Sequence, residues 1–455
     1  MQNDVRREIF SLAIPVVFSS FLQRITAMVD VFLVGGLGAA AIAAVGLGQL
    51  MVLLAMTLVW GLSAGTTVVV AQLYGAQRRD DVAAVGFHAV VLGLFIGLGI
   101  GLAGLRFGRD GAAFIGAQAP VLTLLDPYLR VVFCFFVCTL LVNLLSAVLY
   151  GIGNTRPPLH AAVVMNVVHV AVAYPLIYGA WGAPRLGVLG AAVAVGASEL
   201  TGALYLLAIC FRKRYLRAGR IRADLLRHVW HVGLPVFGER LLQQSSQMMY
   251  AKVVMLYGTV AYAAHQVGLT IEAMSFLPGL GISMAATTAV GQRLGARQWL
   301  QAAIAHREAR RLALMFMSAM AVLFFFAPTA LLRLFTSDPE VIGLGTSFLK
   351  IVAVLQIPLA MTMVLSGSLR GAGDTLFLFW STIVGSWGIR VPLAWLLATV
   401  FAADVTVIWS LMIVDWLARM GLLMYRYRTE NWRTTQLLGD PTPELDPSLV
   451  PAKNG

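Results

Sequence analysis

Long apolar segments recur along the whole chain, with short polar stretches between them. Most extend for about 20 residues or more, the length that an α-helix needs to cross the hydrocarbon core of a bilayer. A backbone in lipid must satisfy its own hydrogen bonds, which a helix does within one segment. The pattern therefore predicts twelve membrane-spanning helices, near residues 10–35, 45–71, 83–105, 124–148, 158–179, 187–211, 229–256, 262–290, 310–334, 343–368, 376–398 and 403–425.

The composition supports this assignment. Of the 455 residues, 59% are hydrophobic and 12% are charged, whereas a soluble domain has about 25% charged residues. We therefore expect an all-α integral membrane protein. The sequence shows no cluster of metal ligands, no nucleophile motif and no phosphate-binding loop, so we do not expect an enzyme, a metal site or a bound cofactor.

The basic residues indicate the orientation in the membrane. The chain has 33 Lys and Arg residues against 21 Asp and Glu residues, a net charge of +12. With a cytoplasmic N-terminus, 22 of the 33 fall in cytoplasmic segments and 4 in outside loops. Because basic residues accumulate on the cytoplasmic side, we expect both termini in the cytoplasm and the chain in the inner (plasma) membrane. The charge then reflects topology and contact with anionic membrane lipids, and nucleic acid is not an expected partner.

The chain contains an internal repeat with an offset of 220 residues. LYGIGNT at 149–155 and LRGAGDT at 369–375 agree at four of seven positions. The same offset relates further pairs, including Pro15 and Pro235, Gly61 and Gly281, Thr67 and Thr287, Gln72 and Gln292, and Gly75 and Gly295. Chance similarity between apolar segments would not keep one offset through loops. Two homologous halves of six spans have the same orientation, an arrangement in which transporters place substrate between the halves.

These observations divide the chain into four parts. Residues 1–215 form an N-terminal six-helix lobe, 216–228 a basic cytoplasmic linker, and 229–430 a C-terminal six-helix lobe. Residues 431–455 contain four prolines and no apolar period, so we expect a disordered cytoplasmic tail.

Two glycines occupy each copy of the repeated loop: Gly151 and Gly153 in the first, Gly371 and Gly373 in the second. Glycine adopts positive φ without steric cost, and Asn154 or Asp374 can cap the following helix. We interpret the loops as hinge-like cytoplasmic turns. The alternative is a pair of ordinary tight turns.

Four stretches resemble the multidrug and toxic compound extrusion (MATE) family. They are the pattern P-x(14)-D-x(4)-G-x-x-G that begins at Pro15, AAHQVGL at 263–269, PGLGISMAATTAVGQRLGA at 278–296 and LRGAGDT at 369–375. The resemblance covers essentially the whole chain. It implies two six-helix lobes arranged as a V, and export of organic, often cationic, compounds in exchange for H⁺ or Na⁺.

Asp30 matches an acidic residue that family members carry in the first helix. An ionised carboxylate is costly in a bilayer and usually has a function, so we expect Asp30 to bind and release the coupling ion. His169 would form a proton relay with Asp30 if the two side chains face each other, and a core histidine bonded to a neighbouring helix is the alternative. Asn166, one turn earlier, could orient either group.

The resemblance also bears on the coupling ion. His169 and Ala173 stand where family members have an Asn and an Asp, and Val195 stands where a small hydroxyl residue is often found. In the second half, Gln243 and Leu359 stand where some members have a Glu and an Asp. A hard cation needs several oxygen ligands, so H⁺ is favoured over Na⁺.

A second polar group is expected to contact substrate. The predicted substrate-binding residues are Gln23, Glu239, Gln243, Gln247, Tyr250 and Glu272. Four of them lie on the seventh span at steps of four and three, which places them on one helix face. The alternatives are a helix–helix contact through amide side chains and a solvated Glu239 near the cytoplasmic end. Asp415 and Arg419 are expected to pair with each other, and Arg390 is expected to neutralise an acid.

The predicted function is a secondary antiporter that exports cationic, amphipathic organic compounds in exchange for H⁺, by alternating access and as a monomer. The alternative in the same fold superfamily is a flippase for lipid-linked oligosaccharides or lipids. Such flippases often have a cleft with several cationic residues, whereas the spans here hold few basic residues. A membrane enzyme or a channel ranks lower, because the chain has no catalytic motif and no filter motif.

Overall fold

The computed structural model describes residues 2–217, 219, 222–430 and 432, and regular structure there is helical throughout. The first half consists of α1 (Gln2–Gly35), α2 (Ala39–Gly75), α3 (Arg79–Phe114), α4 (Ala119–Cys134), α5 (Phe136–Gly151), α6 (Arg156–Tyr178), η1 (Ala180–Gly182) and α7 (Val188–Arg212). The second half consists of α8 (Ala223–Met255), α9 (Thr259–Gly295), α10 (Trp299–Phe326), α11 (Pro328–Arg333), α12 (Pro339–Ala372), α13 (Thr375–Thr382), η2 (Ile383–Arg390), α14 (Val391–Thr399) and α15 (Val405–Arg428).

These helices confirm the all-α membrane fold. Within the described residues, ten helical segments are long and apolar enough to cross a membrane, and α4 with α5 makes an eleventh. The remaining long helix, α8, has 33 residues but a more polar sequence that includes Glu239 and Arg240. With α8, these segments correspond to the twelve predicted spans. Large apolar side chains such as Phe32 and Phe95 are 81% and 74% exposed, as expected for surfaces that face lipid.

Two predicted spans are less regular than their sequences suggested. The span near 124–148 is two helices that meet at Phe135 with a bend of 45°. The span near 376–398 contains η2, a π-helix of eight residues. Such π-helical segments are rare and often lie at functional sites.

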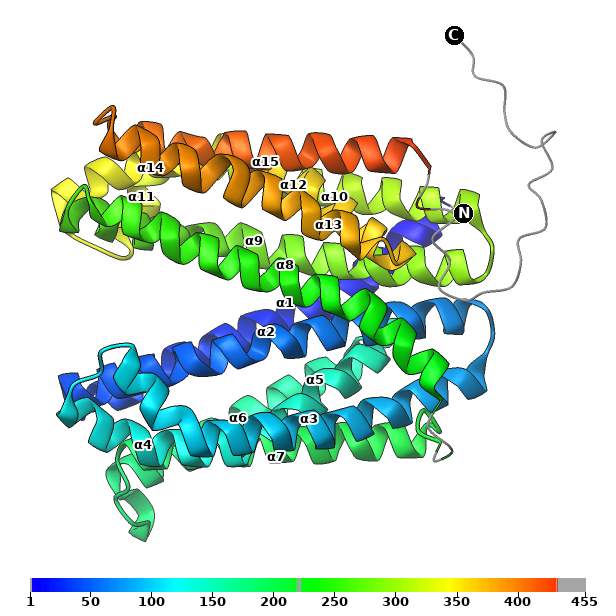
Figure 1. Cartoon of the computed structure of the whole chain (residues 1–455), viewed down its shortest axis with the longest axis horizontal. Helices are drawn as coiled ribbons and strands as arrows, with labels where there is room; N and C mark the ends of the chain where they lie inside the picture. Colours follow the sequence, from blue (N-terminus) through cyan, green and yellow to red (C-terminus); the bar gives the residue numbers. More distant parts are fainter. Residues whose placement is uncertain (1, 218, 220–221, 431, 433–455) are drawn as a thin grey trace.

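The helices form two bundles, the lobes, which Figure 1 shows close together near the start of α1 and the end of α15 and diverging toward the opposite end. We call the end with the start of α1 the N-terminal side. The two bundles form the V that the family resemblance implied.

Each lobe has its own apolar core, but the first helix of each half contributes to both. Ile9 of α1 packs in the core of the C-terminal lobe, whereas Val34 at the other end of α1 packs in that of the N-terminal lobe. The reverse holds for α8, with Val229 in the N-terminal core and Val253 in the C-terminal core. The first part of α1 therefore packs in the core of the C-terminal lobe, and the first part of α8 packs in the core of the N-terminal lobe.

The lobes approach most closely where the last turns of α2 and α9 meet. A Cβ atom added to Gly75 would collide with the Gln292 carbonyl oxygen, and one added to Gly295 would collide with that of Gln72. These four residues are two pairs related by the 220-residue offset. The two backbones can touch only because both contact positions lack a side chain.

The two glutamines also join the lobes through their side chains. Gln72 Nε2 donates to the Gly371 carbonyl at 3.0 Å, and Gln292 Nε2 donates to the Gly151 carbonyl at 2.8 Å. Each bond runs from one lobe to the repeated loop region of the other. The two hydrogen bonds, like the glycine contacts, are related to each other by the 220-residue offset.

Further contacts between the lobes lie on the same side. A Cβ atom on Gly61 of α2 would be 2.7 Å from the Gly233 carbonyl oxygen of α8, and one on Gly281 of α9 would collide with Val17 of α1. Arg293 of α9 forms an ion pair with Glu8 of α1 at 2.7 Å. All these contacts involve the halves of α1, α2, α8 and α9 nearest the N-terminal side.

The glycines of the repeated loops divide into two kinds. Gly153 and Gly373 have φ of 81° and 92°, as the turn interpretation requires. Gly151 and Gly371 instead lie in the last turns of α5 and α12, so the expectation of positive φ is wrong for them. They allow close packing, because a Cβ on Gly151 would be 2.8 Å from the Thr67 carbonyl oxygen and one on Gly371 would be 2.5 Å from that of Thr287. A hinge role for the loops stays a prediction.

The expected caps of the following helices are also wrong. The N-cap residue of α6 is Thr155 rather than Asn154, and it makes no side-chain cap bond. Asp374 is the N-cap residue of α13 but does not bond to its backbone. Its carboxylate pairs with Arg426 at 2.6 Å, because a charged partner on α15 lies within reach.

The predicted linker, 216–228, is shorter in the structure, since α8 begins within it. Two of its arginines bind the acidic start of α3: Arg217 pairs with Asp80 at 2.6 Å, and Arg222 pairs with Asp81. The described part of the linker is thus held against α3.

The predicted tail, 431–455, lies outside the described residues apart from Trp432. The Trp432 ring stacks on Tyr427 with centroids 5.1 Å apart, and its Nε1 donates to the Tyr427 carbonyl at 2.9 Å. This indole therefore contacts the end of α15.

The Gly75 contact gives a first prediction. Gly75→Ala places a methyl group against the opposing carbonyl and should push the lobes apart on the N-terminal side. Spin labels at Arg78 and Gln298, with the native cysteines replaced, should report a longer or broader distance in electron paramagnetic resonance. Gly99→Ala is the control, because no atom lies within 4 Å of its added Cβ. An unchanged distance in Gly75→Ala would show that this contact does not hold the lobes together.

Candidate functional site

Two titratable side chains meet inside the N-terminal lobe. Asp30 of α1 and His169 of α6 are 6% and 1% exposed, and His169 Nε2 lies 2.7 Å from Asp30 Oδ1. The sequence left open whether these residues face each other, and the structure brings them into direct contact. Their role in ion coupling stays a prediction.

Asn166 lies one turn before His169 and joins α6 to α1 by a different route. Its Oδ1 accepts a hydrogen bond from the Thr26 hydroxyl at 2.5 Å, and its Nδ2 donates to the Ala162 carbonyl at 2.8 Å. The structure gives Asn166 no bond to Asp30 or His169. Asn166 can therefore fix the position of α1 against α6, four residues from Asp30 along α1.

Glu199 is a third titratable group of this region that the sequence analysis did not select. It lies on α7, beside the Thr139 hydroxyl and close enough to His169 for an electrostatic interaction. Glu199 Oε2 and His169 Nδ1 are buried without a hydrogen-bond partner among the described residues. The signal in the sequence was the same as for Asp30, an acidic residue within an apolar span.

The C-terminal lobe holds a different set of charges at equivalent helices. Asp415 of α15 pairs with Arg419 at 2.7 Å, as its spacing predicted, and with Arg390 of η2 at 3.5 Å. Arg390 also donates to Ser246 Oγ at 3.1 Å, and its guanidinium lies 5.3 Å from the centre of the Tyr250 ring. Tyr250 is the repeat counterpart of Asp30. The C-terminal lobe therefore has an aromatic ring beside an arginine at the position where the N-terminal lobe has a carboxylate bonded to a histidine.

The predicted substrate-binding residues do not form one exposed surface. Tyr250 is 1% exposed, and its hydroxyl donates to the Ile408 carbonyl at 2.8 Å. Glu272 is also buried, whereas Gln23 is exposed. Tyr250 and Glu272 therefore lie inside the C-terminal lobe rather than on an open face. No observation tests a substrate role for any of the six residues.

Glu239 is not solvated at the end of its helix. It is buried and pairs with Arg370 of α12, with 3.0 Å between Arg370 Nη2 and Glu239 Oε2. The alternative of a water-exposed Glu239 is therefore wrong, because the guanidinium of Arg370 neutralises the Glu239 carboxylate. Gln243 and Gln247, on the same helix, are half-buried.

A small cavity opens beside this ion pair, inside the C-terminal lobe. Its volume is about 50 Å³. It is lined from five elements, with Glu239, Arg240 and Gln243 from α8, Phe276, Leu280 and Ser283 from α9, Thr362, Met363, Ser366 and Arg370 from α12, Ser381 and Thr382 from α13, and Trp416 and Arg419 from α15. Two of the predicted substrate-binding residues, Glu239 and Gln243, therefore line this cavity.

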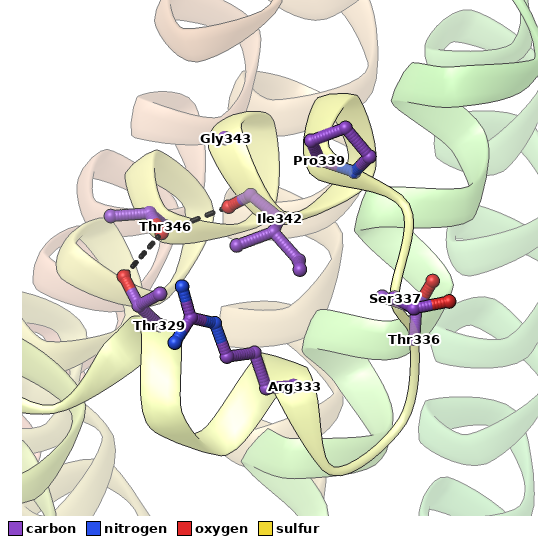
Figure 2. Close-up of a pocket in the computed structure, with 8 residues that line it drawn as sticks. All are labelled: Thr329, Arg333, Thr336, Ser337, Pro339, Ile342, Gly343 and Thr346. Atoms are coloured by element: carbon purple, nitrogen blue, oxygen red, sulfur yellow. Dashed lines mark hydrogen bonds between the residues drawn. The ribbon is translucent and has the colours of Figure 1, made fainter.

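A larger hollow of about 630 Å³ lies in the loop region between α11 and α12. Figure 2 shows Thr329 and Thr346 side by side above Arg333, and the hydroxyls of the two threonines lie 3.4 Å apart. None of the predicted site residues lines this hollow.

Comparison with known proteins places the chain in a family. The MatE family model matches twice, at residues 15–175 and 235–396, and so covers more than half of the chain. The two matches begin 220 residues apart, in agreement with the repeat.

Relatives and solved structures match nearly the whole length. The probable multidrug resistance protein NorM of Thermotoga maritima is 29% identical over 443 residues, covering 96% of this chain and 95% of that protein. The multidrug resistance protein MdtK of Yersinia pseudotuberculosis is 27% identical over 412 residues, covering 86% and 87%. A solved structure described as the outward-facing conformation of a multidrug resistance MATE family transporter has the same fold, with a TM-score of 0.86 at 22% identity over 94% of this chain and 96% of the other. The chain therefore belongs to the MATE family of membrane transporters.

Proposed function

We propose that this chain is a secondary antiporter that exports amphipathic organic compounds, cationic ones among them, in exchange for H⁺. The contact between Asp30 and His169, both buried in membrane-spanning helices, carries the proposal. Ionisable residues in such positions are costly and usually mark the path of an ion or a substrate. Relatives that are named multidrug resistance proteins support the same class of cargo.

The proposed cycle is alternating access. The lobes touch on the N-terminal side, which we place in the cytoplasm because most loop arginines and lysines lie there. Asp30 lies five residues before α1 ends at Gly35, in the half of α1 away from this contact. A proton that arrives from outside can then reach Asp30 while the lobes remain closed toward the cytoplasm. The contacts between the lobes on the N-terminal side support this state.

The surroundings of Asp30 support H⁺ rather than Na⁺ as the coupling ion. Its direct partner is a nitrogen of His169, and the Oδ1 atom of Asn166 already accepts a bond from Thr26. A hard cation binds several oxygen ligands, whereas a carboxylate and an imidazole can pass a proton between them. No cofactor other than the coupling ion is proposed.

The acids of the N-terminal lobe, Asp30 and Glu199, support a cargo with a cationic group. Glu239, a predicted substrate-binding residue of the C-terminal lobe, does not add to this preference, because Arg370 compensates its charge. The preference for a cation would therefore arise from one lobe. We further propose that a single chain in the inner membrane is the working unit, since each lobe completes its own polar site.

The flippase alternative has less support. The cavity beside Glu239 measures about 50 Å³, which is small for a pyrophosphate with an attached sugar. The family model that matches both halves is MatE.

The antiport proposal predicts that Asp30→Asn abolishes ion-driven export. In proteoliposomes with an inward H⁺ gradient, efflux of a fluorescent organic cation should fall by at least about tenfold, because the amide cannot carry the proton. Asp110→Asn is the matched control, since the Asp110 side chain is 72% exposed at the end of α3. Wild-type efflux by Asp30→Asn would make Asp30 structural and would favour the flippase.

The choice of ion gives a separate prediction. An inward H⁺ gradient alone should drive efflux in wild-type proteoliposomes, and an inward Na⁺ gradient alone should not. His169→Ala should slow H⁺-driven efflux by about tenfold, since a hydrogen bond to a charged group contributes about 1.5–3 kcal/mol. His160→Ala, an exposed position on the same helix, should leave the rate unchanged. Efflux driven by Na⁺ alone would contradict the argument from oxygen ligands.

A further inference from the structure

The cavity in the C-terminal lobe has an unusual balance of charge. Its lining includes three arginines, Arg240, Arg370 and Arg419, against one carboxylate, that of Glu239. It also includes five hydroxyl groups, those of Ser283, Thr362, Ser366, Ser381 and Thr382. A guanidinium only donates, whereas a hydroxyl both donates and accepts, and the Ser283 and Ser381 hydroxyls already donate to backbone carbonyls. The excess of donors in the wall therefore comes from the three arginines.

Two of the three arginines already have carboxylate partners. Arg370 pairs with Glu239 at 3.0 Å, and Arg419 pairs with Asp415 at 2.7 Å. The third, Arg240, has no ion pair or hydrogen bond among the described residues. Its guanidinium lies 5.9 Å from the centre of the Trp60 ring of the other lobe, and Glu239 is close enough for an electrostatic attraction.

Donor atoms remain unused at this site. The Nε atoms of Arg240 and Arg370 are buried and have no hydrogen-bond partner in the described part of the chain. Glu239 is the one carboxylate of the lining and is already bonded to Arg370, so Arg240 and Arg370 share a single counter-charge, which is costly in a membrane protein. The planar guanidinium fork matches the two oxygens of a carboxylate, which would satisfy several of these donors at once.

The two lobes thus place different charged groups at equivalent helices. The N-terminal lobe places the acids Asp30 and Glu199 on α1 and α7. The C-terminal lobe places Arg240 on α8 and Arg419 on α15, with Arg390 behind them on η2. A compound that touches both lobes would meet an acidic site on one side and a basic cavity on the other.

We propose that this cavity binds the carboxylate of an amphipathic cargo, so that the transporter accepts zwitterionic and anionic compounds as well as cationic ones. The proposal rests on the proposed export function and specifies its substrate class. The volume of about 50 Å³ admits a carboxylate but not the aromatic body of a drug. That body would remain outside, next to Trp60, which already borders Arg240.

Equilibrium binding to the purified full chain in detergent tests this assignment. The probes are tetramethylrhodamine, a zwitterion with a free carboxylate, and its methyl ester, which is a cation with nearly the same shape. Fluorescence anisotropy at low ionic strength, in a buffer free of carboxylate anions, gives Kd for each dye with little competition from other anions. The wild type should bind the acid about tenfold more tightly than the ester, which corresponds to one charge-assisted bond of about 1.4 kcal/mol.

Two variants of the lining should move this preference in opposite directions. Arg240→Gln should weaken acid binding about tenfold and leave ester binding unchanged. Glu239→Gln removes the competing carboxylate, so it should tighten acid binding by several-fold, a gain that misfolding cannot produce. Arg333→Gln, which removes a positive charge from the distant hollow of Figure 2, is the control and should change neither dye.

The outcomes separate this inference from the antiport proposal. Equal binding of acid and ester by the wild type, or equal losses for both dyes in Arg240→Gln together with no gain in Glu239→Gln, would overturn the carboxylate site. Because no ion gradient is involved, the binding result stands whether or not H⁺ drives transport. Conversely, a failed H⁺ experiment would leave a measured preference for the acid intact.

Discussion

The close approach of two backbones, those of α2 and α9, is the constraint on which the rest of the structure depends. Gly75 and Gly295 leave room for the opposing carbonyl groups, and Gln72 and Gln292 then reach the loop regions of the other lobe. The bonded carbonyls, those of Gly151 and Gly371, belong to the last turns of α5 and α12, where a helix lacks internal donors. Each glutamine therefore completes a helix end in the opposite lobe. Water could replace these bonds, and a hydrogen bond contributes only about 0.5–1.5 kcal/mol net, so the contact is compatible with repeated opening and closing.

The duplicated fold keeps this contact symmetrical while its polar sites diverge. The contact residues keep their identity across the 220-residue offset, because Gly75 corresponds to Gly295 and Gln72 corresponds to Gln292. The site residues do not, because Asp30 corresponds to Tyr250, which lies below Arg390. On the proposed function, the shared geometry lets the lobes move against each other, and the different charged groups would let one cargo be recognised at two chemically different ends.

The sequence predicted features that rest on pattern and offset, and it missed features that rest on how helices are rotated and packed. Twelve spans and two halves follow from apolar length and repetition, and the candidate pair Asp30 and His169 follows from rare charges together with the family resemblance. The sequence pattern does not reveal which helix face meets which neighbour in three dimensions. For this reason the pairing of Glu239 with Arg370 could not be predicted, and the helical role of Gly151 was taken for a turn. The bend at Phe135 and the π-helix η2 likewise depend on packing against neighbouring helices.

Helix α1 connects the two functions of the molecule. Its start packs in the core of the C-terminal lobe and pairs Glu8 with Arg293, and its far end holds Asp30 against His169. These two ends are about 33 Å apart along the helix, at about 1.5 Å per residue. Pro15 lies between them and removes one backbone hydrogen bond, which makes bending less costly there. A ligand shifts a conformational equilibrium only when it binds the two states with different affinity. On the proposed mechanism, a proton on Asp30 changes the bond to His169 and hence the fit of α1 against α6, and α1 carries that change across Pro15 to the contact between the lobes.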